Sequence, residues 1–304
     1  MSTQAINLSF FSGTILYNES LRPYNTFGIG GHAKILVQPN TPEDVAQTIL
    51  ECTSLHIPYI IIGCGSNILF SDEDYPGVVI HMKSHLTKIH LHSNRMVFVQ
   101  AGVLMQNAIQ WFLQHQLTGY TYLAGIPGTM GGCIAMNAGT NRGRINQIVQ
   151  RVQYFNGLHI QEMEGKELQD SFHYRSSIFL EQKWCILSAL LLLEEGDIEK
   201  EKKQLQNYLQ KRSTSQPLQF KSAGCFWKNP PQRSTGKILE ELGLKGLKIG
   251  NVKISDLHAN FILNMGGGTC KEVLALAEKV EDIVYQKTGI VLDREVQHVT
   301  GMLH

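Results

Sequence analysis

Gly125-Ile126-Pro127-Gly128-Thr129-Met130-Gly131-Gly132 is the stretch that decides the fold, and Asn137-Ala138-Gly139 follows it closely. Its glycines are more numerous than an ordinary turn needs. A second glycine-dense stretch, Gly63-Cys64-Gly65-Ser66-Asn67, directly follows an apolar, β-branched segment that predicts a strand at 57–62. Glycine lets backbone N–H groups approach an anion closely. Two such stretches beside strands therefore favour a protein that wraps the pyrophosphate of a dinucleotide cofactor.

The stretch at 63–67 is weak evidence when taken alone, because a sharp structural turn explains it equally well. It also departs from the G-x-G-x-x-G fingerprint, since Ile68 stands where the third glycine belongs. Leu69-Phe70 does not open a convincing helix. The sequence therefore disfavours an ordinary Rossmann fold.

Strand and helix patterns alternate along the chain. Thr41 is typical of an N-cap, with Pro42 at the first helical position, and predicts a helix that ends near Leu55. Asp197 likewise predicts the cap of a solvated connecting or covering helix. The remaining predicted elements are strands at 33–37, 78–80, 88–92, 97–99, 149–155, 185–193 and 291–299, and helices at 105–116, 197–212 and 271–287. This order predicts one α/β unit followed by a second.

Composition limits the function classes. The 304 residues are 43% apolar and 17% charged, which is enough for two or three globular domains. A formal net charge of +1 provides no positive field for nucleic acid, so we expect no nucleic acid partner. The six cysteines form no Cys-x-x-Cys pair, which favours a reducing cytoplasm. No apolar run reaches the roughly 20 residues that span a bilayer, and we predict neither membrane association nor a secretion signal.

Histidines at 81, 85, 90 and 92 suggest a metal site, but no cysteine or acidic cluster joins them at a known ligand spacing. His90 and His92 fit alternate, solvent-facing positions of a strand. We therefore predict no bound metal.

The glycine stretches belong to a set of motifs that closely resembles the MurB family, the UDP-N-acetylenolpyruvoylglucosamine reductases. The motifs occur in order at 25–31, 63–67, 125–132 with 137–139, 174–179, 222–230 and 292–296. Their spacing matches the shorter form of the family, which lacks an inserted tyrosine loop. The resemblance implies a mixed α+β and α/β protein, with an FAD-binding fold of the vanillyl-alcohol-oxidase (PCMH) type in two subdomains, 1–83 and 84–196. A C-terminal α+β substrate-binding domain would span 197–304, with a last strand that could return to the FAD-binding domain.

The resemblance further implies noncovalent FAD as the cofactor and NADPH as the cosubstrate. In the family, hydride passes from flavin N5 to C3 of a nucleotide-sugar enolpyruvyl ether, and a proton follows at C2. The implied cofactor-binding residues are Gly63, Cys64, Gly65, Ser66, Asn67, Gly125, Ile126, Pro127, Gly128, Thr129, Gly131, Gly132, Asn137 and Gly139. The sequence at 140–143 departs from the aromatic-glycine continuation common in the family.

Three residues match the family's catalytic positions: Arg175, Cys225 and Glu295. Arg175 would stabilise an enolate-like carboxylate with its planar fork, although a structural salt bridge is the plain alternative. Cys225 replaces a serine of many relatives and would give the proton to C2, because a thiol with an ordinary pKa of about 8.5 is mostly protonated at neutral pH. A buried cysteine that acts as a small apolar residue is the alternative. Glu295 would orient the intermediate or assist the proton step, unless Asp293 and Arg294 make it part of a surface pair.

The resemblance also implies a set of substrate-binding residues: Tyr174, Arg175, Lys228, Asn229 and His258. The expected partner is a small-molecule nucleotide-sugar, and we expect a monomer. Two other functions remain open at this point. One is a different flavin oxidoreductase on the same fold, and the other is a noncatalytic nucleotide-sugar binder, which the joint presence of Arg175, Cys225 and Glu295 disfavours.

Overall fold

The computed structural model describes residues 6–231 and 233–301. Contacts between residues divide the chain into two compact units, each built from three segments. Unit 1 comprises Met1–Tyr17, Ile35–Cys64 and Gly77–Gln210, and unit 2 comprises Asn18–Lys34, Gly65–Pro76 and Lys211–His304. The three-domain division at 83 and 196 remains a prediction.

A four-stranded sheet begins unit 1. Its strands follow the order β1 (Thr14–Ser20), β2 (His32–Gln38), β5 (Tyr75–His81) and β3 (Tyr59–Ile62), and β3 and β5 run parallel. Helix α1 (Pro42–Ser54) connects β2 with β3 and supplies buried Val45 and Ile49 to the core. Thr41 Oγ1 accepts from the Asp44 amide at 3.0 Å, which confirms the predicted N-cap. The order β2, α1, β3 confirms the strand–helix–strand unit that the sequence predicts.

The second sheet of unit 1 has five strands, and every pairing in it is antiparallel. Its order is β12 (Ile160–Glu164), β11 (Val149–Phe155), β15 (Cys185–Leu192), β7 (Met96–Gln100) and β6 (Ile89–Ser93). The expected second α/β unit is therefore wrong in class. Short hairpin connections join β6 to β7 and β11 to β12, and such connections produce antiparallel neighbours, so this part is α+β.

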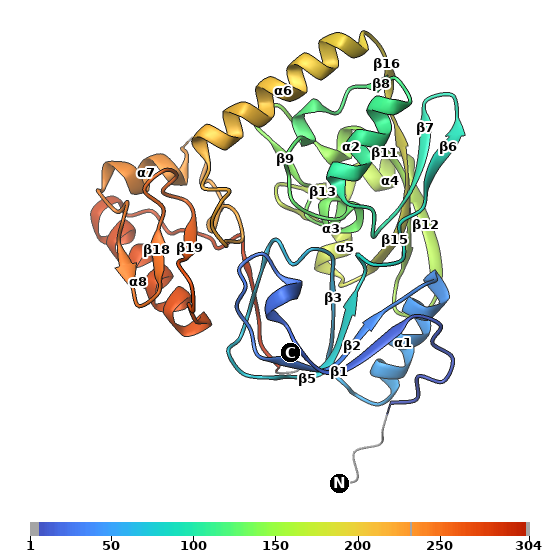
Figure 1. Cartoon of the computed structure of the whole chain (residues 1–304), viewed down its shortest axis with the longest axis horizontal. Helices are drawn as coiled ribbons and strands as arrows, with labels where there is room; N and C mark the ends of the chain where they lie inside the picture. The colour runs from blue at the N-terminus through green and yellow to red at the C-terminus, as the bar shows by residue number, and fades with distance from the viewer. Residues whose placement is uncertain (1–5, 232, 302–304) are drawn as a thin grey trace. The chain divides into compact units, whose positions relative to one another are not determined.

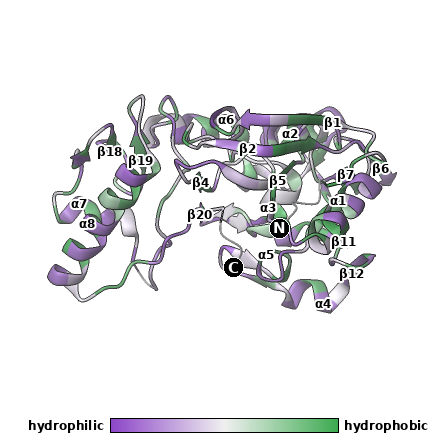
Figure 2. Ribbon diagram, turned by 90° about the horizontal axis from the view of Figure 1, so that it is seen from below, coloured by the Kyte–Doolittle hydropathy of each residue, from purple (hydrophilic) through white to green (hydrophobic). Residues whose placement is uncertain are grey.

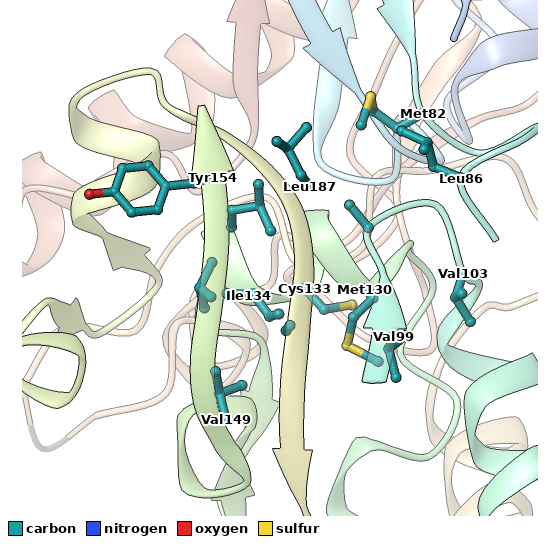
Figure 3. Packing of buried hydrophobic residues seen from close by; sticks show 14 of the residues in the cluster. Met82, Leu86, Val99, Val103, Met130, Cys133, Ile134, Val149, Tyr154 and Leu187 are labelled. Carbon is teal, nitrogen blue, oxygen red and sulfur yellow. The ribbon is translucent and has the colours of Figure 1, made fainter. Parts of the chain in front are cut away.

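The core of unit 1 packs between these strands and the helices α2 (Met105–Gln114) and α3 (Met130–Ala135). Figure 3 shows Met130, Cys133 and Ile134 of α3 beside the strands that carry Val99 and Val149. Shorter elements complete this unit: β8 (Leu117–Thr118), β9 (Gly139–Thr140), β10 (Gly143–Arg144), β13 (Phe172–His173), β14 (Ser176–Ser177), β16 (Glu194–Glu195), α4 (Gly165–Asp170) and α5 (Ile178–Glu181). The helix α3 thus begins within the glycine stretch at 125–132 and fixes the end of that stretch in the core.

Helix α6 (Ile198–Ser215) begins as predicted, because Asp197 Oδ1 accepts from the amides of Glu199 and Lys200. Figure 1 shows it as one long, straight helix. Its buried Glu201 accepts from the amides of Gly119 and Tyr120 at 3.1 and 3.3 Å. The first turn of α6 is therefore attached to unit 1 by a buried carboxylate.

Unit 2 contains a three-stranded antiparallel sheet, β17 (Lys248–Ile249), β18 (Val252–Ile254) and β19 (Ile262–Asn264), with helices α7 (Thr235–Glu241) and α8 (Cys270–Thr288). Helix α8 buries residues at three- and four-residue spacing, among them Val273, Ala277 and Val280, and Figure 2 shows both apolar and polar colours along it. The predicted amphipathic helix is confirmed. Within residues 6–231 and 233–301, no helix is both long and apolar enough to cross a membrane.

The strand predicted at 291–299 is wrong in extent, because only β20 (Gln297–Val299) forms there. The chain changes partners within this stretch. The Glu295 amide donates to the Phe226 carbonyl at 2.8 Å, whereas from Gln297 onward the chain pairs in parallel with β4 (Ile68–Phe70). The local sequence pattern cannot reveal such a change of partner.

Candidate active site

The glycine stretch at 125–132 runs along the segment that begins α2. The Met105 amide donates to the Gly128 carbonyl at 3.0 Å, and the Gly131 amide donates to the Ala101 carbonyl at 2.9 Å. A Cβ on Gly131 would lie 2.8 Å from the Ala101 Cβ, closer than real side chains approach. Gly125 has φ +70° and so needs the left-handed region. Backbone shape and close packing thus account for these two glycines.

The structure brings the two predicted glycine stretches together. A Cβ on Gly63 would lie 2.3 Å from Thr129 Oγ1, so only glycine permits this approach. Thr129 Oγ1 also accepts from the Gly132 amide and caps α3. Ile126 lies next to the core of unit 1, and Pro127 connects it to Gly128.

Buried His81 supports the first glycine stretch from the end of β5. Its ring forms a hydrogen bond with the Gly63 backbone, and its Nδ1 lies 3.3 Å from Gln38 Nε2. Burial, with a smaller contribution from Lys83, lowers the pKa of His81 to about 4. Burial raises the pKa of the neighbouring Cys64 thiol, against the opposing effect of Lys83. His81 is therefore neutral at physiological pH and acts as a support for the loop, a role that the sequence did not indicate.

The rest of the first glycine stretch belongs to unit 2. Gly65 has φ +60°, and a Cβ there would lie 2.4 Å from the Tyr24 carbonyl oxygen. Asn67 Nδ2 donates to the Glu295 carbonyl at 2.9 Å, and Ser66 stands between Gly65 and Asn67. Two motifs that lie far apart in the sequence, at 63–67 and 292–296, therefore meet in this unit.

The turn that carries Arg175 is bonded to the segment that follows α3. Arg175 Nη1 donates to the Gly139 carbonyl at 3.0 Å, and Asn137 Nδ2 donates to the His173 carbonyl at 3.0 Å. Arg175 itself has φ +58°, which is uncommon for a residue with a side chain. Tyr174, next to it, is 39% exposed. The turn of the predicted catalytic arginine is thus bonded to two predicted cofactor-binding residues, through Arg175 itself at Gly139 and through His173 at Asn137.

In unit 2, Cys225 and Glu295 lie on adjacent extended segments. Cys225 forms an antiparallel bridge with Phe261, and the Glu295 amide donates to the carbonyl of Phe226. Trp227 forms a bridge with Arg294. Both predicted catalytic residues are half-buried. Their backbones are therefore held next to each other by pairings between distant segments.

Glu281 of α8 secures these segments, and sequence reasoning missed it. Its Oε1 accepts from Trp227 Nε1 and from Arg294 Nε, both at 2.7 Å, and its Oε2 accepts from Arg294 Nη2 at 2.8 Å. The hydrogen bond with Glu281 raises the pKa of Arg294. Glu281 is one helical turn from buried Ala277, so a charge on the apolar face of α8 was the available signal. Arg294 pairs with Glu281, which differs from the surface pair with Glu295 that the sequence left open.

Two of the predicted substrate-binding side chains make local structural contacts. Asn229 Oδ1 accepts from the Thr235 amide at the start of α7, at 3.0 Å. His258 Nδ1 accepts from the Asn260 amide at 3.3 Å, and burial lowers its pKa. The half-buried Lys228 has its amide bonded to the Asp293 carbonyl. Their roles toward a substrate stay predictions.

The described residues contain no group of three His, Cys, Asp or Glu that could hold a metal ion. Within the described part of the chain, no disulfide joins the cysteines at 52, 64, 133, 185, 225 and 270.

Comparisons with known proteins extend over nearly the whole chain. Residues 33–157 match an FAD binding domain, and residues 216–299 match the C-terminal domain of UDP-N-acetylenolpyruvoylglucosamine reductase. The chain is 35% identical to the UDP-N-acetylenolpyruvoylglucosamine reductase of Caldanaerobacter subterraneus subsp. tengcongensis over 288 residues, 94% of each protein. It is 36% identical to that of Clostridioides difficile, with 93% of this chain and 92% of the relative covered.

A solved structure is similar over the same extent. The crystal structure of the enzyme from Thermus caldophilus has a TM-score of 0.80 and 31% sequence identity, and the match covers 95% of this chain and 99% of that one. The similarity therefore includes both the FAD-binding part and the C-terminal part.

Proposed function

The chain belongs to the UDP-N-acetylenolpyruvoylglucosamine reductase family, and on that premise we propose that it reduces UDP-N-acetylglucosamine enolpyruvate to UDP-N-acetylmuramate with NADPH. The observation that carries the proposal is the presence of both family domains in one chain, with similarity over 94% of its length. The reaction would serve the synthesis of the peptidoglycan precursor. The enzyme is an oxidoreductase with FAD as its cofactor.

The residues of the glycine stretches fit FAD. Both stretches lie in the residues that match an FAD binding domain, and the close approach of Gly63 to Thr129 holds them side by side. We assign FAD binding to the residues at 63–67, to Gly125, Ile126, Pro127, Gly128, Thr129, Gly131 and Gly132, and to Asn137 and Gly139. When bound, FAD supplies the hydride-carrier chemistry between NADPH and C3 of the enolpyruvyl ether.

Arg175 is proposed to stabilise the carboxylate of the enolpyruvyl group. Negative charge moves through C2 into this carboxylate as hydride arrives at C3, and a planar guanidinium can bind two carboxylate oxygens at once. The bond from Nη1 to the Gly139 carbonyl fixes the side chain before substrate arrives. A preoriented charge of this kind needs little reorganisation during the reaction.

Cys225 is proposed to deliver the proton to C2, with Glu295 as the residue that orients the reacting group. Positioned general acids contribute roughly 10²- to 10⁴-fold to a rate. The support for the pair is that Cys225 and Glu295 lie on segments bonded through Phe226, so the two residues belong to one structural element.

The nucleotide-sugar is proposed to bind to a separate set of residues: Tyr174, Lys228, Asn229 and His258. We place the enzyme in the cytoplasm as a monomer.

The test separates the two half-reactions by stopped-flow absorbance of the flavin. Reduction by NADPH should stay near the wild-type rate in Arg175→Lys and in Cys225→Ala. Reoxidation by the enolpyruvyl substrate should slow in both, by roughly 10²- to 10⁴-fold in Cys225→Ala, whereas Cys225→Ser should retain useful turnover. Equal slowing of both half-reactions would refute the assigned roles, and a protein that binds no FAD would refute the function itself.

A further inference from the structure

The hairpin formed by β9 and β10 lies directly beside the turn that carries Arg175. Its register pairs Arg144 with Gly139, and the Gly139 carbonyl accepts from Arg175 Nη1 at 3.0 Å. A Cβ on Gly139 would lie 2.6 Å from the Arg144 Cα. The absence of a side chain at Gly139 therefore lets Arg144 come close to the segment that binds Arg175.

Arg144 and Arg175 share one aromatic ring. Their guanidinium carbons lie 5.3 and 5.5 Å from the centroid of the Tyr174 ring, within the range of cation–π interactions. Tyr174 is 39% exposed, and Arg144 is exposed. Two guanidinium groups thus contact one exposed ring, at a surface that a dissolved ligand can reach.

A third arginine extends this positive surface. Exposed Arg142 lies over the ring of Tyr208 at 4.9 Å, and the Tyr208 hydroxyl lies 2.8 Å from Thr140 Oγ1 in the same hairpin. In the part of the chain that the structure describes, no carboxylate forms an ion pair with Arg142 or Arg144. We call Arg142, Arg144, Tyr174 and Arg175 the arginine–tyrosine patch. Within this patch, the positive charges of Arg142 and Arg144 are not balanced by an ion pair with a carboxylate of the described residues.

We propose that Arg144, supported by Arg142, is a binding residue for the diphosphate group of a nucleotide substrate of this enzyme. The inference rests on the proposed function, in which both NADPH and the nucleotide-sugar carry a diphosphate. Guanidinium forks match phosphate oxygens in pairs, and a group with two negative charges relieves the repulsion between neighbouring arginines. The substrate has two anionic groups, a carboxylate with one charge and a diphosphate. Because the carboxylate is already assigned to Arg175, the guanidinium of Arg144 is left for the diphosphate.

The experiment uses the FAD-loaded enzyme and measures binding of UDP, ADP, uridine and adenosine by calorimetry. Arg144→Met should weaken UDP binding, ADP binding or both by about 10- to 100-fold, because a charge-assisted hydrogen bond is lost. The nucleoside affinities should not change. A loss of UDP affinity would show that Arg144 binds the diphosphate of the nucleotide-sugar. A loss of ADP affinity would show that it binds the diphosphate of NADPH. Raising the salt concentration should weaken diphosphate binding to the wild type more than to Arg144→Met.

Arg95→Met is the matched control, because Arg95 is an exposed arginine of unit 1 in the turn between β6 and β7. It removes the same charge and should leave every affinity within twofold. Arg144→Lys should lose less affinity than Arg144→Met, since it keeps the charge without the fork. FAD content and NADPH-dependent flavin reduction of the wild type establish the proposed function separately. Unchanged UDP and ADP affinities in Arg144→Met, or an equal loss for the nucleosides, would overturn the diphosphate assignment while the proposed function stands.

Discussion

The two units hold their predicted site residues in different ways. In unit 1, the glycine stretches and the turn of Arg175 are shaped by left-handed residues and by contacts that leave no space for a Cβ, as at Gly63 and Gly131. In unit 2, Cys225 and Glu295 are held by bridges between segments far apart in the sequence and by the Glu281 carboxylate. Unit 1 is therefore sensitive to added atoms at these residues, and unit 2 is sensitive to the loss of a contact with a residue distant in the sequence.

The largest expected effect concerns His81, whose ring supports the first glycine stretch in unit 1. Its pKa is about 4 in the folded protein and about 6.5 in an unfolded chain, so the unfolded chain takes up the proton first as the pH falls. The stabilisation from neutral His81 is complete above pH 6.5 and is lost progressively as the pH falls toward 4. Across this window we expect the free energy of unfolding to fall by about 3 kcal/mol more in the wild type than in His81→Gln.

Urea unfolding at a series of pH values measures this difference. His85→Gln is the control, since His85 is exposed. A wild type and a His81→Gln protein with parallel pH profiles would show that His81 does not support the loop as a buried neutral group.

A pair of adjacent glycines in α3 tests the sensitivity to added atoms. The Cβ of Gly131→Ala would meet the Ala101 Cβ at 2.8 Å, whereas that of Gly132→Ala has Thr129 Oγ1 as its nearest neighbour at 3.6 Å. Overpacking should make Gly131→Ala less stable by about 1–3 kcal/mol and weaken FAD binding. Gly132→Ala should be neutral or more stable by up to about 1 kcal/mol, because alanine favours the helix. Urea unfolding and FAD titration by flavin fluorescence measure both, and equal behaviour of the two variants would contradict the packing argument.

The smallest effect is expected from Glu281→Gln, which tests the dependence of unit 2 on a remote partner. The change removes the ion pair with Arg294 while a hydrogen bond from Trp227 remains feasible. The free energy of unfolding should fall by about 1 kcal/mol, since the pair is partly exposed. Flavin reoxidation by substrate should slow several-fold while flavin reduction by NADPH is unchanged. Asp282→Asn, an exposed charge on the same helix, should alter neither rate, and an equal effect of both variants would remove the positioning role of Glu281.

The sequence predicted best what local chemistry determines. The N-caps at Thr41 and Asp197 and the strand at Val149–Phe155 are confirmed because neighbouring residues alone specify them. The two glycine stretches were also recognisable, since a turn that excludes side chains leaves a visible composition. Family resemblance then joined these stretches to one function, which the residue pattern alone left open.

The failures all depend on partners that are distant in the sequence. The strand predicted at 291–299 is shorter because the chain changes its bonding partner between Glu295 and Gln297. The antiparallel second sheet depends on which strands become neighbours, and strand periodicity does not encode that choice. The role of Glu281 requires knowing that Trp227 and Arg294 converge on one helix face.

The parallel pairing of β4 with β20 has a consequence for synthesis on the ribosome. Residues 68–70 emerge from the ribosome long before their partners at 297–299. At about 5–20 residues per second, β4 waits on the order of ten to forty seconds for its neighbour. During this interval the apolar side chains of Leu69 and Phe70, both 1% exposed in the folded protein, lack that cover. Unit 1, whose segments end at Gln210, can complete its own core first, so the nascent chain should need chaperone protection mainly for the early segments of unit 2.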